Sequence, residues 1–371
     1  MKARQLPTQS GPWTVSHVRD LRQALRQHLS LAHQGSLIPP GFHHVSFNRI
    51  VEENQLCEDG AERSHAPSDA WKFRVWAGGH MGFDMPRVHV NTTKFVKVSE
   101  RITDVRVVGD PARDDSKIFV TLTKWLRASL HKKNDDTDID TDTSGGSSAF
   151  ASMIREQKHL CFMRDVPPSL KAAGSTPRRL PPPTEPFHSQ TMTPSRTLLF
   201  RFSALSQNAH AIHLDADFTR RVYGIPDLLV QGPLTSVLML EVLRKALRMA
   251  SRVEDGRFSQ DGRFQLYSSE SDPDHNHVLA VREFEYRNLL PLFVDEPITI
   301  ACKRAVTNDS PSAYNSHVGG SEGEGGWPAS PGEKWDVWIQ KGQGDNAMLA
   351  VKGKALVQPV RVARRPGKRM A

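Results

Sequence analysis

The sequence has few cysteines and no long hydrophobic run. Its three cysteines, Cys57, Cys161 and Cys302, lie far apart in a chain of 371 residues. They match neither the spacing of a zinc site nor an even-numbered disulfide framework, so they favour a reducing compartment. No apolar run approaches the length of a membrane span, and we therefore expect no transmembrane segment.

The sequence also lacks strand–helix alternation and the glycine pattern of a phosphate-binding loop. These absences favour an antiparallel sheet over an alternating α/β fold. No nucleic-acid-binding motif accompanies the net charge of +8, so we expect no nucleic-acid partner. We interpret the basic cluster at residues 361–369 as a solvated tail, with attraction to acidic or phosphate-bearing partners as the alternative.

The N-terminus has two interpretations. Its first 30 residues contain five lysines or arginines and one acid, which is compatible with a mitochondrial presequence. However, Val18, Leu21, Leu25 and Leu29 follow helical spacing, so residues 15–31 are equally predicted to form a helix of the folded domain.

The first half of the chain contains several predicted strands. Residues 71–83 alternate and then break at Gly78-Gly79, which predicts a strand with a bulge or tight turn. In residues 117–126, Ile118, Val120 and Leu122 share one face, as in a sheet with one buried face. Further strands are predicted at residues 88–98, 102–108 and 156–164.

Three segments have the composition of loops or linkers. Residues 132–148 are poor in hydrophobic side chains, and we predict a disordered insertion there. Their alternating aspartates resemble part of a calcium loop but lack its central glycine and terminal glutamate. The proline-rich residues 166–195 predict a linker, and residues 308–334 predict a second disordered loop.

The second half is organised around residues 200–247. An apolar run beginning at Phe200 is predicted to be a strand, and a polar cluster with His210 and His213 follows it. Gly232-Pro233 then leads into residues 234–249, a helix so apolar in its first turns that it must be surrounded by protein. Later strands are predicted at residues 278–286, 297–306, 335–340 and 348–357.

These patterns predict an α+β fold, with antiparallel sheets in both halves and one buried helix in the second. His43 and His44 lie in an apolar setting, with no carboxylate or cysteine at metal-binding spacing. We therefore interpret both as structural histidines and expect no metal site.

The segments FRFSALSQNAHAIHLD and LLVQGPL resemble the MaoC-like hydratase/dehydratase superfamily, in the branch of the mitochondrial 3-hydroxyacyl-thioester dehydratases type 2. The similarity continues in FEYRNLLPLFVDEPITI and AMLAVKGKALV, and RVWAGGHMGF is similar to the first domain of that family. The resemblance covers most of the chain outside its loops and linker.

The resemblance implies a double hot-dog fold, in which two antiparallel sheets lie side by side with the site between the lobes. Residues 1–165 would form a degenerate hot-dog domain similar to a fatty-acid-synthase-type dehydratase. Residues 166–195 would form the linker, and residues 196–360 the MaoC-like catalytic hot-dog domain with the central helix.

The resemblance also implies reversible interconversion of (3R)-3-hydroxyacyl and trans-2-enoyl thioesters without a cofactor. In the type 2 branch the substrate is carried by acyl carrier protein in mitochondrial fatty acid synthesis, which implies the mitochondrial matrix. Related proteins act on coenzyme A thioesters such as mesaconyl- or itaconyl-coenzyme A. A carboxylate on the substrate would require a cation, for which Arg201, Arg282 and Arg287 are candidates. A homodimer is compatible with the sequence.

The implied site contains three main residues. His213 matches the family histidine that transfers protons, a role suited to imidazole near neutral pH. Asn208 occupies the position of the superfamily aspartate and would orient water through its amide. The N–H of Gly232, at the helix start, would stabilise the thioester oxygen.

Two further residues have secondary roles in this hypothesis. His210 lies three residues before His213, and Gln231 replaces a histidine that the family usually carries before Gly-Pro. Glutamine can orient a neighbour but cannot titrate. Since Asn208 and Gln231 both lack titrating groups, a non-catalytic acyl-thioester binding protein is the remaining alternative.

Overall fold

The structure is a computed structural model. It describes residues 1–2, 4, 6–13, 15–32, 38–48, 50–84, 95–110, 113, 115–129, 150–171, 180–254, 267–268, 275–305 and 332–363. The predicted insertion at residues 132–148 lies outside these ranges, as does nearly all of the predicted loop at residues 308–334.

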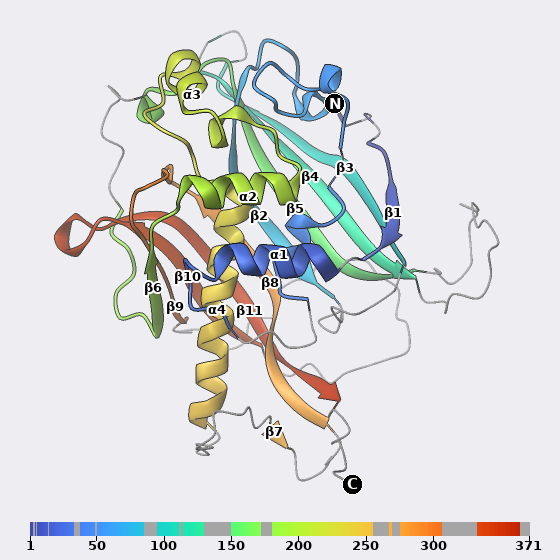
Figure 1. Cartoon of the computed structure of the whole chain (residues 1–371), viewed down its shortest axis with the longest axis vertical. Helices are drawn as coiled ribbons and strands as arrows, with labels where there is room; N and C mark the ends of the chain where they lie inside the picture. The colour runs from blue at the N-terminus through green and yellow to red at the C-terminus, as the bar shows by residue number, and fades with distance from the viewer. Residues whose placement is uncertain are drawn as a thin grey trace.

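The described strands form one antiparallel sheet of eleven strands (Figure 1). Its N-terminal half contains, in spatial order, β1 (Gln9–Pro12), β3 (Phe95–Val108), β4 (Lys117–Ser129), β5 (Phe150–Met163) and β2 (Phe73–Phe83). Its C-terminal half continues with β8 (His275–Asn288), β11 (Met348–Ala363), β10 (Glu333–Lys341), β9 (Ile298–Arg304) and β6 (His188–Met192), and β7 (Tyr267–Ser268) pairs with β8.

The two halves are joined by the pairing of β2 with β8. Gly78 is opposite Arg287, and the ladder runs through Met81 opposite Phe284 to Gly82 opposite Glu283. The two sheets expected side by side are thus joined edge to edge. The edge strands of the two halves satisfy each other's backbone hydrogen bonds and form one continuous sheet.

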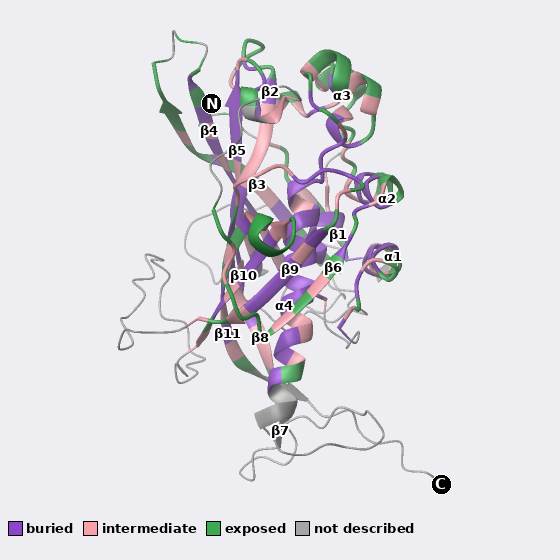
Figure 2. Cartoon of the chain, turned by 90° about the vertical axis from the view of Figure 1, so that its left-hand side faces the viewer, coloured by how far each residue is buried: buried purple, intermediate pink, exposed green. Residues whose placement is uncertain are grey.

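The helices lie on one side of this sheet (Figures 1 and 2). The longest, α4 (Gly232–Glu254), packs against β8, β9 and β10, and Leu238 and Leu240 in its first turns are fully buried. The α1 helix (Val15–Leu25) packs against α2 (Arg196–Ser206). The shorter α3 (Ala216–Tyr223) follows α2. No described helix is long and apolar enough to span a bilayer.

The N-terminal segment is a helix built into the fold. Val18, Leu21 and Leu25 are buried in the same core as α4, so the helical interpretation of residues 15–31 is confirmed for residues 15–25. The amphipathic spacing of the leucines explains this packing.

The strand predicted at Phe200 is wrong, because this run forms α2. Leu198, Leu199 and Phe202 are buried at helical spacing, and the Ser195 hydroxyl accepts a hydrogen bond of 3.1 Å from the Leu198 N–H. An N-cap serine and a helical apolar stripe together favour helix over strand.

Most other predicted elements are present with shifted ends. The predicted strands at residues 88–98 and 102–108 are one strand, β3, whose described part begins at Phe95. Strand β6 lies inside the range predicted as a linker and pairs with β9, so the C-terminal sheet begins earlier than expected. The predicted buried face of β4 is confirmed at Ile118, Val120 and Leu122.

Gly78 provides a test of the join between the halves. Its φ is +153°, and an added Cβ would lie 2.2 Å from the Tyr286 carbonyl oxygen across the join. We expect Gly78→Ala to lower the free energy of unfolding by about 2–4 kcal/mol, through overpacking and backbone strain. Chemical denaturation would measure this loss.

Gly82→Ala is the matched control in the same strand, since an added Cβ there meets no atom within 4 Å. We expect this variant to be as stable as the wild type or slightly more stable. Equal losses in the two variants would contradict the importance of close backbone approach at Gly78.

Candidate active site

A cavity of about 860 Å³ lies where the two halves of the sheet meet. Strand β2 contributes Val75, Trp76 and Ala77 to its wall, and Asn288 is the last residue of β8. Four of the five predicted site residues line it, namely Asn208, His210, His213 and Gly232. Gln231 does not line the cavity.

His213 lies at the end of a short 3-10 turn, Ala211–His213, and its side chain is buried. Its Nδ1 is 2.7 Å from the backbone oxygen of Leu229. Because a carbonyl oxygen can only accept, Nδ1 must carry the proton. The neutral ring therefore has a free electron pair on Nε2, which makes that atom a proton acceptor.

Burial keeps His213 neutral. It lowers the pKa of the imidazole to about 3, assisted by the neighbouring His210 and Arg74. A group with this pKa is in its basic form over the whole physiological range.

Asn208 lies between α2 and the turn that carries His213. Its side-chain Oδ1 accepts a hydrogen bond of 3.2 Å from the backbone N–H of His210. Its backbone N–H donates to the backbone oxygen of Ser203, in the last turn of α2. With Oδ1 occupied in this local turn, Nδ2 is the end of the amide that remains to donate into the cavity.

His210 is held by an aspartate from the N-terminal half. Its Nε2 lies 2.9 Å from Oδ2 of Asp59, which also accepts from the Tyr223 hydroxyl at 2.8 Å. Burial opposes ionisation of Asp59, but these hydrogen bonds and one from the Ala61 N–H outweigh it and lower the Asp59 pKa. The His210 ring is edge-on to the His213 ring, with centroids 5.5 Å apart.

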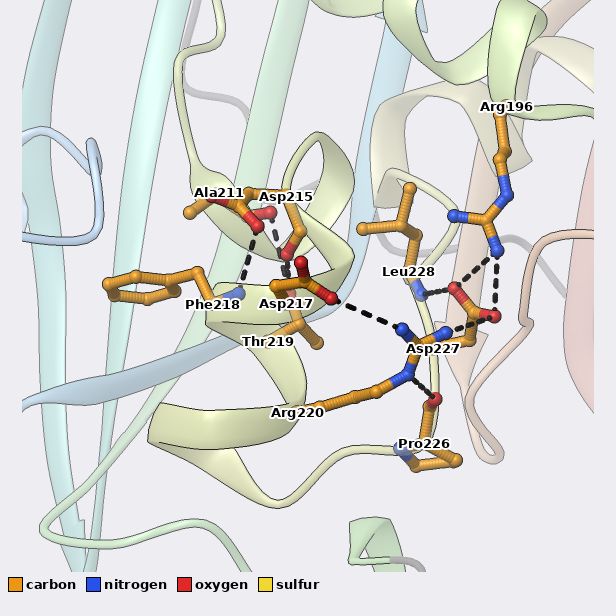
Figure 3. A network of polar contacts seen from close by, with 10 residues as sticks. All are labelled: Arg196, Ala211, Asp215, Asp217, Phe218, Thr219, Arg220, Pro226, Asp227 and Leu228. Atoms are coloured by element: carbon orange, nitrogen blue, oxygen red, sulfur yellow. Dashed lines mark hydrogen bonds and ion pairs between the residues drawn. The ribbon is translucent and has the colours of Figure 1, made fainter.

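The α3 helix and the segment after it support the turn that carries His213 (Figure 3). Asp215 caps α3 by accepting from the Phe218 N–H at 2.8 Å. Asp227 accepts from both Arg196 and Arg220, so α2, α3 and the segment leading to Leu229 are tied together. This network fixes the carbonyl that holds His213 in its tautomer.

Gly232 begins α4 and faces the N-terminal half. An added Cβ would lie 2.5 Å from Cγ of Trp76, so only glycine allows the tryptophan to pack there. The Trp76 carbonyl accepts a hydrogen bond of 2.7 Å from Nδ2 of Asn288. The start of α4 is thus in contact with β2, at the wall of the cavity.

Gln231, the other secondary residue considered from the sequence, packs between α4 and α2. Its side chain is fully buried, and Nε2 donates at 2.9 Å both to the Leu199 oxygen and to the Ser203 hydroxyl. These bonds fix the start of α4 against α2. The amide therefore stabilises the start of α4 without lining the cavity.

Charged side chains from the N-terminal half line part of the cavity. Glu100, Lys124 and Glu156 lie side by side on β3, β4 and β5, facing the interior. Lys158 pairs with Glu100 at 2.7 Å, and Arg74 of β2 lines the same cavity. Arg201, Arg282 and Arg287, the cations considered from the sequence, do not line it.

Among the described residues, one group has the composition of a metal site. His43, His44 and Glu156 are buried and offer ligand atoms within 4.8 Å of one another. The two histidines contact the Glu156 carboxylate at 3.5 Å and 3.4 Å. The ammonium groups of Lys124 and Lys158 lie beside this carboxylate and oppose a further cation.

Sequence reasoning missed the contributions of the N-terminal half, namely Asp59, Arg74, Trp76 and Lys124. The first three carry no local signal, because their role depends on contacts across the join. Lys124 did carry one, since it continues the apolar face of Ile118, Val120 and Leu122 in an alternating strand.

Two solved structures are similar in fold. A MaoC-like dehydratase has a TM-score of 0.52 at 12% identity, with 96% of this chain and 98% of that chain covered. The MaoC-like dehydratase of Phytophthora capsici has a TM-score of 0.51 at 10% identity, with 96% and 97% covered. At this identity the likeness concerns the fold, which is the expected MaoC-like double hot-dog.

Two curated proteins are similar in sequence. The mitochondrial hydroxyacyl-thioester dehydratase type 2 of Schizosaccharomyces pombe is 26% identical over 270 residues, covering 71% of this chain and 77% of that protein. The mesaconyl-C(4)-CoA hydratase of Chloroflexus aurantiacus is 29% identical over 219 residues, covering 56% and 65%.

A family model is the third match, and its range includes the candidate site. The model described as hydroxyacyl-thioester dehydratase type 2 matches residues 41–259. This range contains the turn of His213, the start of α4 and the strands β2 to β5. Because it spans more than half of the 371 residues, the chain belongs to the hydroxyacyl-thioester dehydratase type 2 family.

Proposed function

We propose that this chain catalyses the reversible hydration of trans-2-enoyl thioesters to (3R)-3-hydroxyacyl thioesters. The observation that carries the proposal is the neutral His213, whose Nδ1 is held by the Leu229 carbonyl and whose ring lines the cavity together with Asn208 and Gly232. Membership of the dehydratase family supports the same reaction.

In the hydration direction, His213 is the general base. Its Nε2 accepts a proton from water while the water oxygen bonds to C3 of the enoyl group. The amide Nδ2 of Asn208 donates a hydrogen bond to the same oxygen, which directs a water proton toward the histidine. The two side chains have complementary roles, because one donates to the water and the other accepts from it.

The electron pair displaced from the C2–C3 double bond moves onto the thioester oxygen. The N–H of Gly232, at the positive end of α4, stabilises this enolate. The proton held on Nε2 of His213 then passes to C2 as the carbonyl re-forms. One histidine thus serves both steps, which requires addition of H and OH to the same face of the double bond. Dehydration follows the same steps in reverse.

We place the carrier and the compartment by similarity. The proposed carrier is acyl carrier protein in type II fatty acid synthesis, and the proposed compartment is the mitochondrial matrix. Similarity to the mitochondrial hydroxyacyl-thioester dehydratase type 2 of Schizosaccharomyces pombe supports a mitochondrial compartment. The mesaconyl-C(4)-CoA hydratase supports coenzyme A as the alternative carrier. Rates with the same crotonyl group on each carrier would decide between them, and the higher kcat/KM is expected for acyl carrier protein.

Removal of the general base is the first test of the reaction. We expect His213→Ala to lower kcat for hydration of a crotonyl thioester by about 10²–10⁴-fold, the usual contribution of a positioned base. The control is His188→Ala in β6, which does not line the cavity and should retain activity. Full activity in His213→Ala would remove the mechanism. Binding without turnover in the wild type would favour the non-catalytic alternative.

Asn208 tests the orienting role. We expect Asn208→Asp to keep measurable activity, because the carboxylate still accepts from the His210 N–H and can contact water. Asn208→Leu removes both interactions and should lower kcat by roughly 10²-fold through loss of water positioning. Comparable rates for Asn208→Leu and the wild type would show that the amide does not contact the reacting water.

The pH dependence tests the burial of His213. Protonation abolishes the base, and the burial that lowers the His213 pKa to about 3 places this event far below neutrality. We therefore expect kcat/KM for crotonyl thioester to stay constant as the pH falls from about 8 to about 5.5. A loss of rate with a midpoint near 6.5, the ordinary histidine value, would show that this ring is solvated during catalysis.

A further inference from the structure

We infer that His210 takes part in the reaction by accepting a hydrogen bond from the attacking water at Nδ1. Asp59, from the N-terminal half, is the positioning residue that fixes the required tautomer of this ring. The assignment rests on the proposed function, because it concerns the water that His213 deprotonates. It gives a role in the reaction to a buried carboxylate that comes from outside the half containing His213.

Asp59 is a buried carboxylate held in place by several donors. Its Oδ1 accepts a hydrogen bond of 3.0 Å from the Ala61 N–H. Its Oδ2 accepts from the Tyr223 hydroxyl at 2.8 Å and lies 2.9 Å from Nε2 of His210. These contacts outweigh the effect of burial and lower the pKa of Asp59, so the carboxylate is ionised at neutral pH.

The loop that carries Asp59 packs directly on the turn that carries the two histidines. The backbone oxygen of Asp59 accepts from the Ala211 N–H at 2.7 Å. The next residue, Gly60, has a φ of +76°, and an added Cβ there would lie 2.2 Å from the Ala209 oxygen. The close backbone contact fixes the distance between the carboxylate and the turn.

The contact with Asp59 determines which nitrogen of His210 carries a proton. An ionised carboxylate only accepts hydrogen bonds, so Nε2, which faces it, must be protonated. Burial lowers the pKa of His210, so the ring is neutral at neutral pH and Nδ1 keeps its electron pair. Nδ1 has no hydrogen-bond partner in the part of the chain that the structure describes, and the side chain lines the cavity.

The two histidines therefore offer opposite ring nitrogens as acceptors, Nδ1 in His210 and Nε2 in His213. Their rings are edge-on, with centroids 5.5 Å apart. The backbone links them, because the His213 N–H donates to the His210 oxygen at 3.1 Å. The His210 N–H donates to Oδ1 of Asn208, so two acceptors and the amide Nδ2 belong to one short turn.

A water molecule that attacks C3 of the enoyl group matches this set of groups. One of its lone pairs bonds to C3, and the other accepts from Nδ2 of Asn208. One hydrogen passes to His213. The second hydrogen stays in the product hydroxyl and needs an acceptor in a buried site, which Nδ1 of His210 supplies. All four positions around the water oxygen are then used, which aims its attacking lone pair.

The opposite tautomer of His210 would disturb this arrangement. A proton on Nδ1 would make the ring a second donor to the water, in competition with Asn208 for the lone pair that is not attacking. The second hydrogen of the water would have no acceptor. Asp59 therefore acts on the reaction through His210, by excluding this tautomer.

Asp59→Asn tests the positioning role. The Ala61 N–H cannot turn away, so it holds the amide oxygen, and the amide NH₂ then faces His210. This NH₂ donates to Nε2 and moves the ring proton to Nδ1. We expect kcat for hydration of a crotonyl thioester to fall roughly 10²-fold with KM nearly unchanged, since the lost interaction orients the reacting water.

Nitrogen-15 NMR of histidine-labelled protein gives a readout that a purely structural role would not move. The signals that disappear in His210→Asn identify His210. We expect its proton on Nε2 in the wild type and on Nδ1 in Asp59→Asn. Tyr223→Phe removes another donor to the same carboxylate and should keep both the tautomer and the rate. A wild-type ring protonated on Nδ1, or a loss of kcat in Asp59→Asn without the change of tautomer, would overturn the assignment.

Two substitutions of His210 separate acceptance of a hydrogen bond from proton transfer. His210→Asn places an oxygen close to the position of Nδ1, which accepts a hydrogen bond but does not titrate. His210→Leu offers no acceptor. We expect the Asn variant to be about 10-fold or more faster than the Leu variant, as for one unsatisfied hydrogen-bonding group in a buried site. Equal losses in the two variants would contradict the role of His210 as an acceptor.

The outcomes also separate this assignment from the proposed reaction. Wild-type rates in Asp59→Asn and His210→Leu, together with loss of activity in His213→Ala, would overturn the roles of Asp59 and His210 and leave the reaction standing. Absence of turnover by the wild type would overturn the reaction, and this assignment with it.

Discussion

The pairing of β2 with β8 is the constraint on which the site depends. It joins the two halves into one sheet, and it is possible only because glycine at residue 78 allows the Tyr286 carbonyl to come close. The same strand carries Trp76, which packs on Gly232 at the start of α4. The position of the helix start, and with it the proposed enolate donor, is therefore set by the N-terminal half.

The turn that carries His213 is held in the same way from outside its own half. Asp59 orders His210 through its carboxylate, and its backbone oxygen accepts from the Ala211 N–H at 2.7 Å. On the other side, the Leu229 carbonyl fixes the His213 ring. Because both its backbone and its ring are held, His213 loses little conformational entropy when it acts on substrate. This suits a site in which the partner of the histidine is an amide, Asn208, and not a second titrating group.

The row of charged side chains along the cavity has a stability cost. A row of Glu100, Lys124 and Glu156 on the interior face of a sheet replaces apolar side chains that would pack at lower cost. Burial lowers the pKa of Lys124 to about 8, and Lys158 adds to this effect, so the ammonium is held close to its deprotonation range.

The sequence by itself determined the elements whose apolar pattern is local. The alternation in β4, the apolar first turns of α4 and the segments around His213 and Gly232 predicted strands, a buried helix and the family. The strand predicted at α2 was wrong because two local signals of the same sequence, the Ser195 cap and the helical spacing of the apolar residues, outweigh strand propensity there. Tertiary structure alone decided the joining of two sheets into one, the contact of Trp76 with Gly232 and the meeting of Asp59 with His210. These contacts join residues more than a hundred positions apart, and neither local propensity nor periodicity carries information about such pairs.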